Sequence, residues 1–191
     1  MKLQLHLILL APLACASLAR PATITGGTTT VALDSSFVSL VTGAGITPAP
    51  VAPATLSGTT AMFPITGGDT TTGIIDHAGG LSFTAGTKSA VIENFVIDLP
   101  MLSLSGEVIA NGGTPMMNVP LFNIGTGNQL TISSSLAGDL TAVFGAPDLT
   151  GTPVGVATVS PITATPEPAA FALLLLGLPF ALVLQRSRKL H

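Results

Sequence analysis

A run of ten residues in the middle of the chain, Met101 to Ala110, alternates between two kinds of side chain with a period of two. Ser103, Ser105 and Glu107 mark one face, and the other face carries small or apolar residues: Leu102, Leu104, Gly106, Val108 and Ala110. A shorter run, Leu81 to Ala85, alternates in the same way. Period two with one polar face is typical of antiparallel strands that bury one side. The pattern therefore predicts a chain built mainly from such strands.

Glycine-rich turn signals separate the apolar runs, at 67–69, 78–80, 86–88, 111–113 and 125–128. The run from Ser89 to Leu99 is more uniformly apolar, which predicts a central strand covered on both faces. The segment from Ile46 to Gly58 holds three prolines, so it is expected to be an ordered extended crossover and not a helix or central strand. The predicted fold class is all-β, an antiparallel β-sandwich or open barrel.

Two short helices are predicted within this β-rich body. Asp34 can cap a helix that carries Phe37, Leu40 and Val41 and stops at Gly43. Ser133 or Ser134 can cap a second helix, which stops at Gly145 and carries Leu136, Leu140, Val143 and Phe144. Each helix follows a β-like run. The β-like run followed by a capped helix therefore occurs twice, which is a weak internal similarity. It is equally consistent with a pseudo-symmetric pair and with coincidence.

The charge of the body excludes one class of function. Between Arg20 and Ala164 there are two cations, Arg20 and Lys88, against eight carboxylates, which gives a net charge of −6. The chain also lacks tryptophan and tyrosine. An acidic body without basic patches or stacking rings binds phosphate backbones poorly, so no nucleic acid is expected as a partner.

The N-terminus has the features of a secretory signal peptide. Lys2 supplies a positive start, an apolar stretch follows from Leu3 to Leu13, and small residues precede Arg20. Residues 1–19 are therefore predicted to be a signal helix that signal peptidase cleaves between Ala19 and Arg20, with cleavage after Ala16 as the alternative. Cys15 follows a partial lipobox, so acylation at Cys15 remains open.

The C-terminus has the features of a membrane anchor. Residues 169–184 are uncharged and mostly apolar, and as a helix they would span about 24 Å, slightly less than the ~30 Å hydrocarbon core. A basic tip, 185–191, follows at once with Arg186, Arg188 and Lys189. The positive-inside rule places this tip in the cytoplasm and the preceding domain outside. The prediction is a transmembrane helix that anchors an exported domain in the inner membrane.

The step Pro166-Glu167-Pro168, followed by an apolar helix and a basic end, resembles the PEP-CTERM sorting signal of exopolysaccharide-producing Gram-negative bacteria. The resemblance covers 165–191, and it departs from the pattern at Pro179 and at the final Leu190-His191. It implies an exosortase, a membrane-embedded transpeptidase-like enzyme, as a partner that processes this region. A plain tail anchor is the alternative. The predicted organisation is a signal peptide 1–19, an exported all-β domain 20–158, a proline-rich linker with the motif 159–168, the helix 169–184 and the tip.

His77 is the histidine that remains outside the two ends of the chain. A catalytic dyad with Asp76 would need a nucleophile, and a metal site would need further ligands, so we interpret His77 as a hydrogen-bonded surface residue. The step from His77 to Phe83 reads His-x-Gly-Gly-Leu-x-Phe, and it resembles secreted β-domains, some of them in haem-uptake proteins. That resemblance implies His77 as a possible ligand residue, although tyrosine, a common axial ligand of haem, is absent from the chain.

The carboxylates do not form a recognisable site. Glu93 and Glu107 could act as a glycosidase pair if they met, but their spacing does not require it. Asp69, Asp76 and Asp98 lack the spacing of a calcium loop. No metal, cofactor or catalytic residue is predicted.

These features together predict a non-enzymatic exported protein, held transiently in the inner membrane and then released to the cell surface or extracellular matrix. Its expected role is structural or adhesive, with exopolysaccharide as one partner to consider. The alternative is a periplasmic or surface module that binds haem or a small apolar ligand. A second alternative is a hydrolase of matrix polysaccharide.

Overall fold

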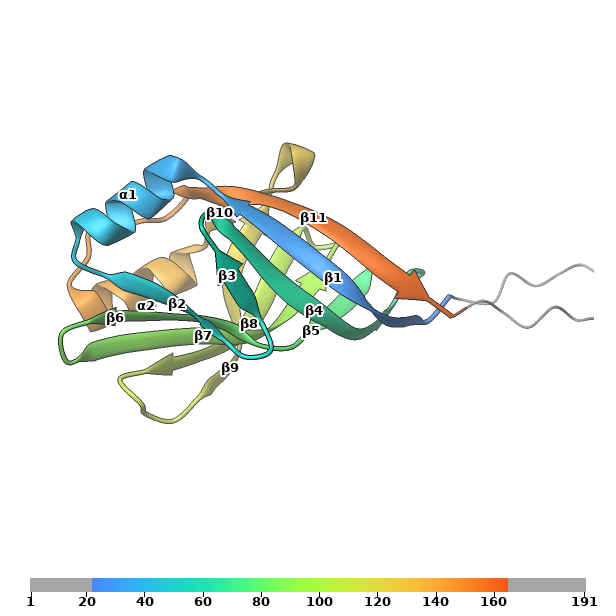
Figure 1. The fold of residues 1–191 in the computed structure, drawn as a ribbon, viewed down its shortest axis with the longest axis horizontal. Coiled ribbons are helices and arrows are strands. Elements are labelled where there is room, and N and C mark those ends of the chain that lie inside the picture. The colour runs from blue at the N-terminus through green and yellow to red at the C-terminus, as the bar shows by residue number, and fades with distance from the viewer. Residues whose placement is uncertain (1–21, 165–191) are drawn as a thin grey trace, which may run out of the picture.

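Eight antiparallel strands close into a barrel in the computed structural model, which describes residues 22–164 (Figure 1). The ring runs β7–β5–β4–β1–β11–β10–β9–β8 and closes where β8 pairs with β7. Its strands are β1 (Ile24–Leu33), β4 (Thr60–Asp69), β5 (Ile74–His77), β7 (Lys88–Asp98), β8 (Ser103–Ala110), β9 (Met116–Ile124), β10 (Gln129–Ile132) and β11 (Pro153–Thr163). The all-β prediction with two short helices is confirmed, and of its two architectures the barrel is the one formed.

The barrel is splayed at one end because β5 has only four residues. β5 joins β4 to β7 through the pairs Ile65–His77 and Ile74–Asp98, near one end of the ring. Beyond β5, the free edge of β7 pairs with β6 (Gly80–Ala85), which in turn pairs with β2 (Thr47–Val51). The free edge of β4 pairs with β3 (Thr55–Ser57). Two sheet edges therefore diverge at this open end, and the prolines of β2 lie in an edge strand, where proline is tolerated.

The two helices lie at the open end. α1 (Ser35–Gly43) follows β1, and α2 (Ser134–Phe144) follows β10 (Figure 1). Asp34 accepts a hydrogen bond from the Ser36 backbone N–H at 2.8 Å, and Ser133 accepts one from Leu136 N–H at 3.1 Å. α2 ends at Gly145, whose φ of 72° is left-handed. Both predicted helices are confirmed with their caps.

The interior of the barrel is filled by inward-pointing residues of the alternating strands. In β8, Leu104, Gly106 and Val108 are buried, as the period of two predicts. Phe63 and Phe95 pack edge to face, with ring centroids 5.0 Å apart and planes at 88°. The prediction that Ser89 to Leu99 is covered on both faces is wrong, because β7 buries one face and a bulge at Asn94 changes which residues point inward.

One predicted boundary needs correction. β11 continues to Thr163 and pairs with β1 down to Ile24, so residues 159–163 belong to the barrel and not to the predicted linker 159–168. Val159 and Ile162 are three residues apart and do not continue a period of two, and Pro161 between them is atypical of a strand, so the sequence does not show that the strand extends this far. Pro161 is tolerated because it lies near the end of the strand, opposite Gly27.

The described chain begins and ends at the closed end of the barrel, opposite the helices (Figure 1). The Ala164 N–H donates to the Thr23 carbonyl at 2.9 Å, so the two ends lie side by side. The signal peptide with the Ala19–Arg20 cleavage site, Cys15, the motif Pro166–Pro168, the anchor 169–184 and the tip with Arg186, Arg188 and Lys189 lie outside the described residues. Within 22–164, neither helix has the length and apolar character needed to cross a bilayer.

Candidate functional site

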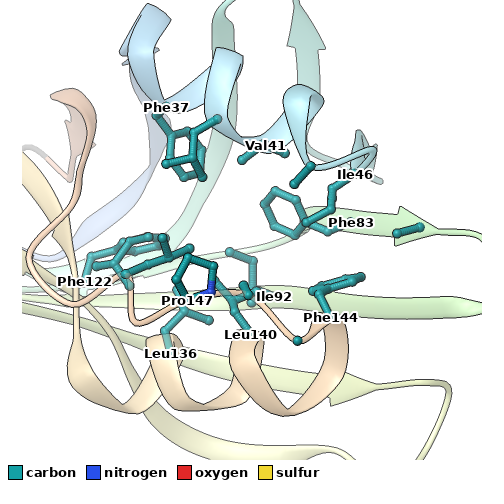
Figure 2. A pocket seen from close by; sticks show the side chains of 17 residues that line it. Phe37, Val41, Ile46, Phe83, Ile92, Phe122, Leu136, Leu140, Phe144 and Pro147 are labelled. Atoms are coloured by element: carbon teal, nitrogen blue, oxygen red, sulfur yellow. The ribbon is translucent and has the colours of Figure 1, made fainter.

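A cavity of about 450 Å³ lies between the two helices and the open end of the barrel (Figure 2). Seventeen residues line it: Phe37, Leu40, Val41, Ala44, Ile46, Phe83, Ala85, Ile92, Phe122, Ile132, Leu136, Leu140, Phe144, Gly145, Ala146, Pro147 and Leu149. They come from α1, α2, the segments that follow these helices, and strands β6, β7, β9 and β10.

Each wall of the cavity follows from a local sequence pattern. In α1, Phe37 and Val41 are four residues apart, so they project from one face of the helix toward the cavity (Figure 2). In α2, Leu136, Leu140 and Phe144 repeat at the same spacing and form the opposite wall. The arrangement of a strand that leads into a capped helix thus occurs twice in the structure, and both helices turn an apolar face to the same space.

The floor is supplied by strands that diverge at the open end. Phe83 of β6 and Ile92 of β7 project into the cavity from one side, and Phe122 of β9 projects from the other (Figure 2). In a closed barrel end these side chains would pack against one another. Here the short β5 leaves the sheet open, and the two helices cover the gap without filling it.

The chemistry of this lining is uniform. None of the seventeen lining side chains carries a nitrogen, oxygen or sulfur atom that could hydrogen-bond a ligand or coordinate a metal. Ordered water needs two to four polar partners, and apolar cavities of about 150 Å³ stay dry and take up benzene or xenon. The cavity is three times that size and within the range of small-molecule sites. Such a space is suited to a ligand that is apolar over most of its surface.

His77 does not line this cavity. It is 6% exposed and lies inside the barrel, so the interpretation of His77 as a surface residue is wrong. Its Nδ1 is 3.2 Å from the carbonyl oxygen of Phe95, which can only accept, so Nδ1 carries the proton. Nε2 then accepts from the Thr29 hydroxyl at 2.7 Å. Both ring nitrogens are engaged, and neither is free to bind a ligand.

Burial also sets the charge of His77. Removal from water lowers the pKa of the imidazole below its ordinary value of 6.5, and hydrogen bonds to the Phe95 and Ile75 backbone and the charge of Asp76 oppose this only in part. The space beside His77, among the residues of the barrel core, measures about 40 Å³. That is room for a water molecule and not for an organic ligand.

The structure brings Glu93 and Glu107 together, which their spacing did not require. They are direct partners in the pairing of β7 with β8. Their neighbours in each strand, Ile92 and Val108, point inward, so the two glutamates lie on the outer face of the barrel. The Asn94 amide donates to Glu107 Oε2 at 3.0 Å. Glu93 follows the lining residue Ile92, but the pair lies on the opposite face of the sheet from the cavity, so it is not placed to act on a molecule bound there.

Two of the remaining acidic candidates, Asp69 and Asp98, accept hydrogen bonds within turns. Asp69 Oδ1 accepts from the Thr71 backbone N–H at 2.6 Å, and Asp98 Oδ1 accepts from the Met101 N–H at 3.0 Å. Asp76 lies in β5 beside His77. Within the described part of the chain, no three histidine, cysteine, aspartate or glutamate residues group closely enough to hold a metal ion.

Sequence reasoning identified the two helices but missed the cavity between them. One feature of the sequence could have indicated the cavity. Both predicted helices carry an apolar face, and each follows a different strand, so the two faces could be expected to cover the same part of the β-structure. The sequence does not show that β5 is short. The residues Thr70–Gly73 indicate a turn, but they do not indicate which strands remain unpaired beyond it.

Comparison with known proteins supports the fold. The structure is similar to the C-terminal domain of HtaA from Corynebacterium glutamicum, with a TM-score of 0.55, 17% sequence identity, and coverage of 75% of this chain and 99% of that one. It is also similar to the haem-binding protein HtaB from the same organism, with a TM-score of 0.53, 10% identity, and coverage of 76% and 98%. No protein-family model and no curated protein sequence matches the chain. At these identities the similarity establishes the fold alone.

Proposed function

We propose that this protein is an exported, non-enzymatic ligand-binding module that takes a small apolar molecule into the cavity between α1 and α2. The single observation that carries the proposal is the size of that cavity together with the apolar character of all its lining side chains. Apolar side chains that line an unfilled space of this volume forgo the close packing that protein cores normally reach. The structural or adhesive role expected from the sequence offers no reason for such a space.

The fold similarity raises haem as a specific ligand, because one neighbour is described as a haem-binding protein. The residues of this cavity do not fit haem held through its iron. Axial ligands to haem iron come from histidine, cysteine, methionine or tyrosine side chains, and none of these lines the cavity. His77 lies in the barrel core with both nitrogens occupied. We therefore propose an apolar organic ligand that needs no metal coordination.

The location of the protein is part of the proposal. The signal peptide would deliver the domain across the inner membrane, and the segment 169–184 would hold it there. Processing at the Pro166–Pro168 region by an exosortase-type enzyme would then release it to the cell surface. Mass spectrometry of the mature protein from its own host tests this step, since it reports both trimmed ends and any group attached at Cys15. An intact C-terminus in the mature protein would contradict it.

Ligand binding can be tested with N-phenyl-1-naphthylamine, an apolar dye whose fluorescence rises when it leaves water. We expect saturable binding to the purified protein. Ala146→Phe places a ring where a lining residue now leaves space, so it should weaken dye binding at least tenfold. Ala142→Phe is the matched control, because Ala142 is exposed on α2 and does not line the cavity. Equal affinities of the two variants, with both folded by circular dichroism, would reject the cavity as the site.

Titration with haemin separates the two ligand classes. We expect no shift of the Soret band that depends on His77, so wild type and His77→Gln should give the same spectrum. A shift in wild type that His77→Gln abolishes would show iron coordination and would overturn the assignment of an apolar ligand.

A further inference from the structure

We propose that, while the chain is anchored, the closed end of the barrel rests on the lipid surface through the turn Leu99–Leu102. This inference depends on the anchoring proposed above for residues 169–184. It does not depend on what the cavity binds. The turn joins β7 to β8 and has the sequence Leu-Pro-Met-Leu.

The turn exposes a concentration of apolar side chains that the domain does not need for packing. Met101 is 74% exposed, Leu102 is 58% exposed and Leu99 is 43% exposed. Single exposed apolar residues are ordinary, but three large ones within four positions form a contiguous apolar tip. Ile162, 62% exposed, adds another apolar side chain near the same end of the barrel.

The tip is built into the fold. The Asp98 carboxylate accepts from the Met101 N–H at 3.0 Å, and the Leu99 N–H donates to the Gly73 carbonyl at 3.1 Å. Leu102 adopts a left-handed backbone with φ of 50°, and its carbonyl accepts from Ile124 N–H at 2.8 Å. These bonds fix the turn at both ends, so the apolar side chains are held outward.

Hydrogen bonds connect this tip to the two chain ends. Ala164 N–H bonds to the Thr23 carbonyl, and Thr70 donates through both its N–H and its hydroxyl to the Ala22 carbonyl. Thr70 belongs to the same hairpin turn as Gly73, which contacts Leu99. The apolar tip and the point where the anchor is attached therefore lie on the same end of the barrel.

The length of the tether fixes the orientation. Four residues, 165–168, separate Ala164 from Ala169, where the predicted membrane helix begins, and the five Cα–Cα steps between the two alanines span at most about 18 Å when fully extended. A domain of this size has a radius of gyration of about 14–15 Å and is therefore wider than the tether is long. The barrel cannot turn its helical end toward the bilayer without stretching the tether around its own width. The closed end is therefore the end that the tether holds nearest to the lipid.

Charge favours contact through apolar insertion into the bilayer. Within the described residues the only lysine or arginine is Lys88, which lies at the start of β7, at the open end of the barrel. Within 22–164 the closed end thus offers no lysine or arginine to attract anionic headgroups, and Asp69 and Asp98 are tied to backbone N–H groups in the turns. Arg20, which the predicted cleavage would leave at the N-terminus, precedes Ala22 by two residues in the sequence, so the test uses uncharged lipid to isolate the apolar contact. Tethering supplies a high local concentration, so a weak apolar contact suffices. In this orientation α1, α2 and the cavity point away from the membrane.

The test uses residues 20–191, the product of the predicted signal-peptide cleavage, which contain no cysteine. This protein is reconstituted through its C-terminal segment into phosphatidylcholine vesicles at less than one chain per vesicle. Met101→Cys is labelled with the fluorophore nitrobenzoxadiazole. Met117→Cys is the matched control, because Met117 is 64% exposed and lies at the start of β9, at the open end. We expect blue-shifted emission at position 101 that lipids carrying a nitroxide quench, and water-like, unquenched emission at position 117.

Water-like emission at both positions in anchored protein would overturn the proposal, and so would failure of the chain to insert, because the tether would then be absent. A blue shift at position 101 without lipid quenching would indicate contact with another protein surface and would also overturn it. Naphthylamine binding is measured on the purified protein without vesicles, because the dye itself partitions into lipid, and it reports the cavity separately. Loss of dye binding with lipid contact retained would reject the proposed ligand site alone.

Discussion

The buried histidine gives the sharpest physical prediction for this domain. His77 is neutral in the folded barrel because burial lowers its pKa below 6.5. In the unfolded chain it titrates normally, so below pH 6.5 the unfolded state binds a proton that the folded state does not. Stability contributed by neutral His77 is therefore complete above pH 6.5 and is lost as the pH falls below that value.

The size of the effect follows from linkage. For a group with an unfolded pKa of 6.5, lowering the pH from about 7.5 to about 5.5 costs at most about 1.4 kcal/mol of unfolding free energy, the limit reached when the folded group stays neutral over the whole range. The two carboxyl groups whose pKa is lowered titrate below this pH range. Hydrogen bonds from Ser36 and Thr150 lower the pKa of Asp34 and Asp148 below 3.8, and burial raises that of Asp139, which acts in the opposite direction. Asp139 is present in both proteins compared below, so its contribution cancels.

Urea unfolding followed by far-ultraviolet circular dichroism measures this loss, and the absence of tryptophan and tyrosine rules out the usual fluorescence probes. His77→Gln is the comparison, because glutamine offers a donor and an acceptor but does not titrate here. Other histidines contribute equally to both proteins and cancel. The wild type should lose up to about 1.4 kcal/mol more than His77→Gln between the two pH values. Parallel pH profiles would show that His77 is not held neutral, and the reasoning would be refuted.

The remaining predictions concern packing around the cavity. Gly80→Ala would place a Cβ 2.6 Å from Glu93 Cα in the pairing of β6 with β7, so it should cost about 1–3 kcal/mol by denaturant unfolding, whereas Gly138→Ala, with open space around it in α2, should gain about 0.5–1 kcal/mol. An equal response of the two variants would contradict this reasoning. Ser133→Ala removes the acceptor for Leu136 N–H and the donor to the Pro120 carbonyl, and it should cost about 1–2 kcal/mol and weaken dye binding. Unchanged stability would mean that water replaces both bonds.

Local patterns in the sequence determined the class of the fold and its helices. Period two depends only on which face of a strand is buried, so β8 could be read from residues 103–110. The same pattern wrongly assigned Met101 and Leu102 to the strand, because they continue the alternation but lie exposed in the turn that precedes it. The helix caps could also be read, because Asp34 and Ser133 satisfy backbone groups only a few residues away. The sorting features at the two ends are local as well, and they remain predictions.

The bulge in β7 shows where local reading fails. Ala90 and Ile92 point inward before the bulge at Asn94, and Phe95 and Ile97 point inward after it. The shift from even to odd positions made the strand look apolar on both faces. Only pairing with β8, which fixes the register on both sides of the bulge, distinguishes a bulged strand from one that is covered twice.

The candidate site depended on tertiary structure altogether. Its lining comes from residues as far apart as Phe37 and Leu149, and each of them alone is an ordinary core residue. The cavity exists because β5 is too short to close the barrel at the end that the helices cover, and His77 is buried because β4, β5 and β7 meet around it. Composition and periodicity specify which side chains avoid water. They do not specify whether those side chains will meet and fill the space between them, because that depends on how strands distant in the sequence pair.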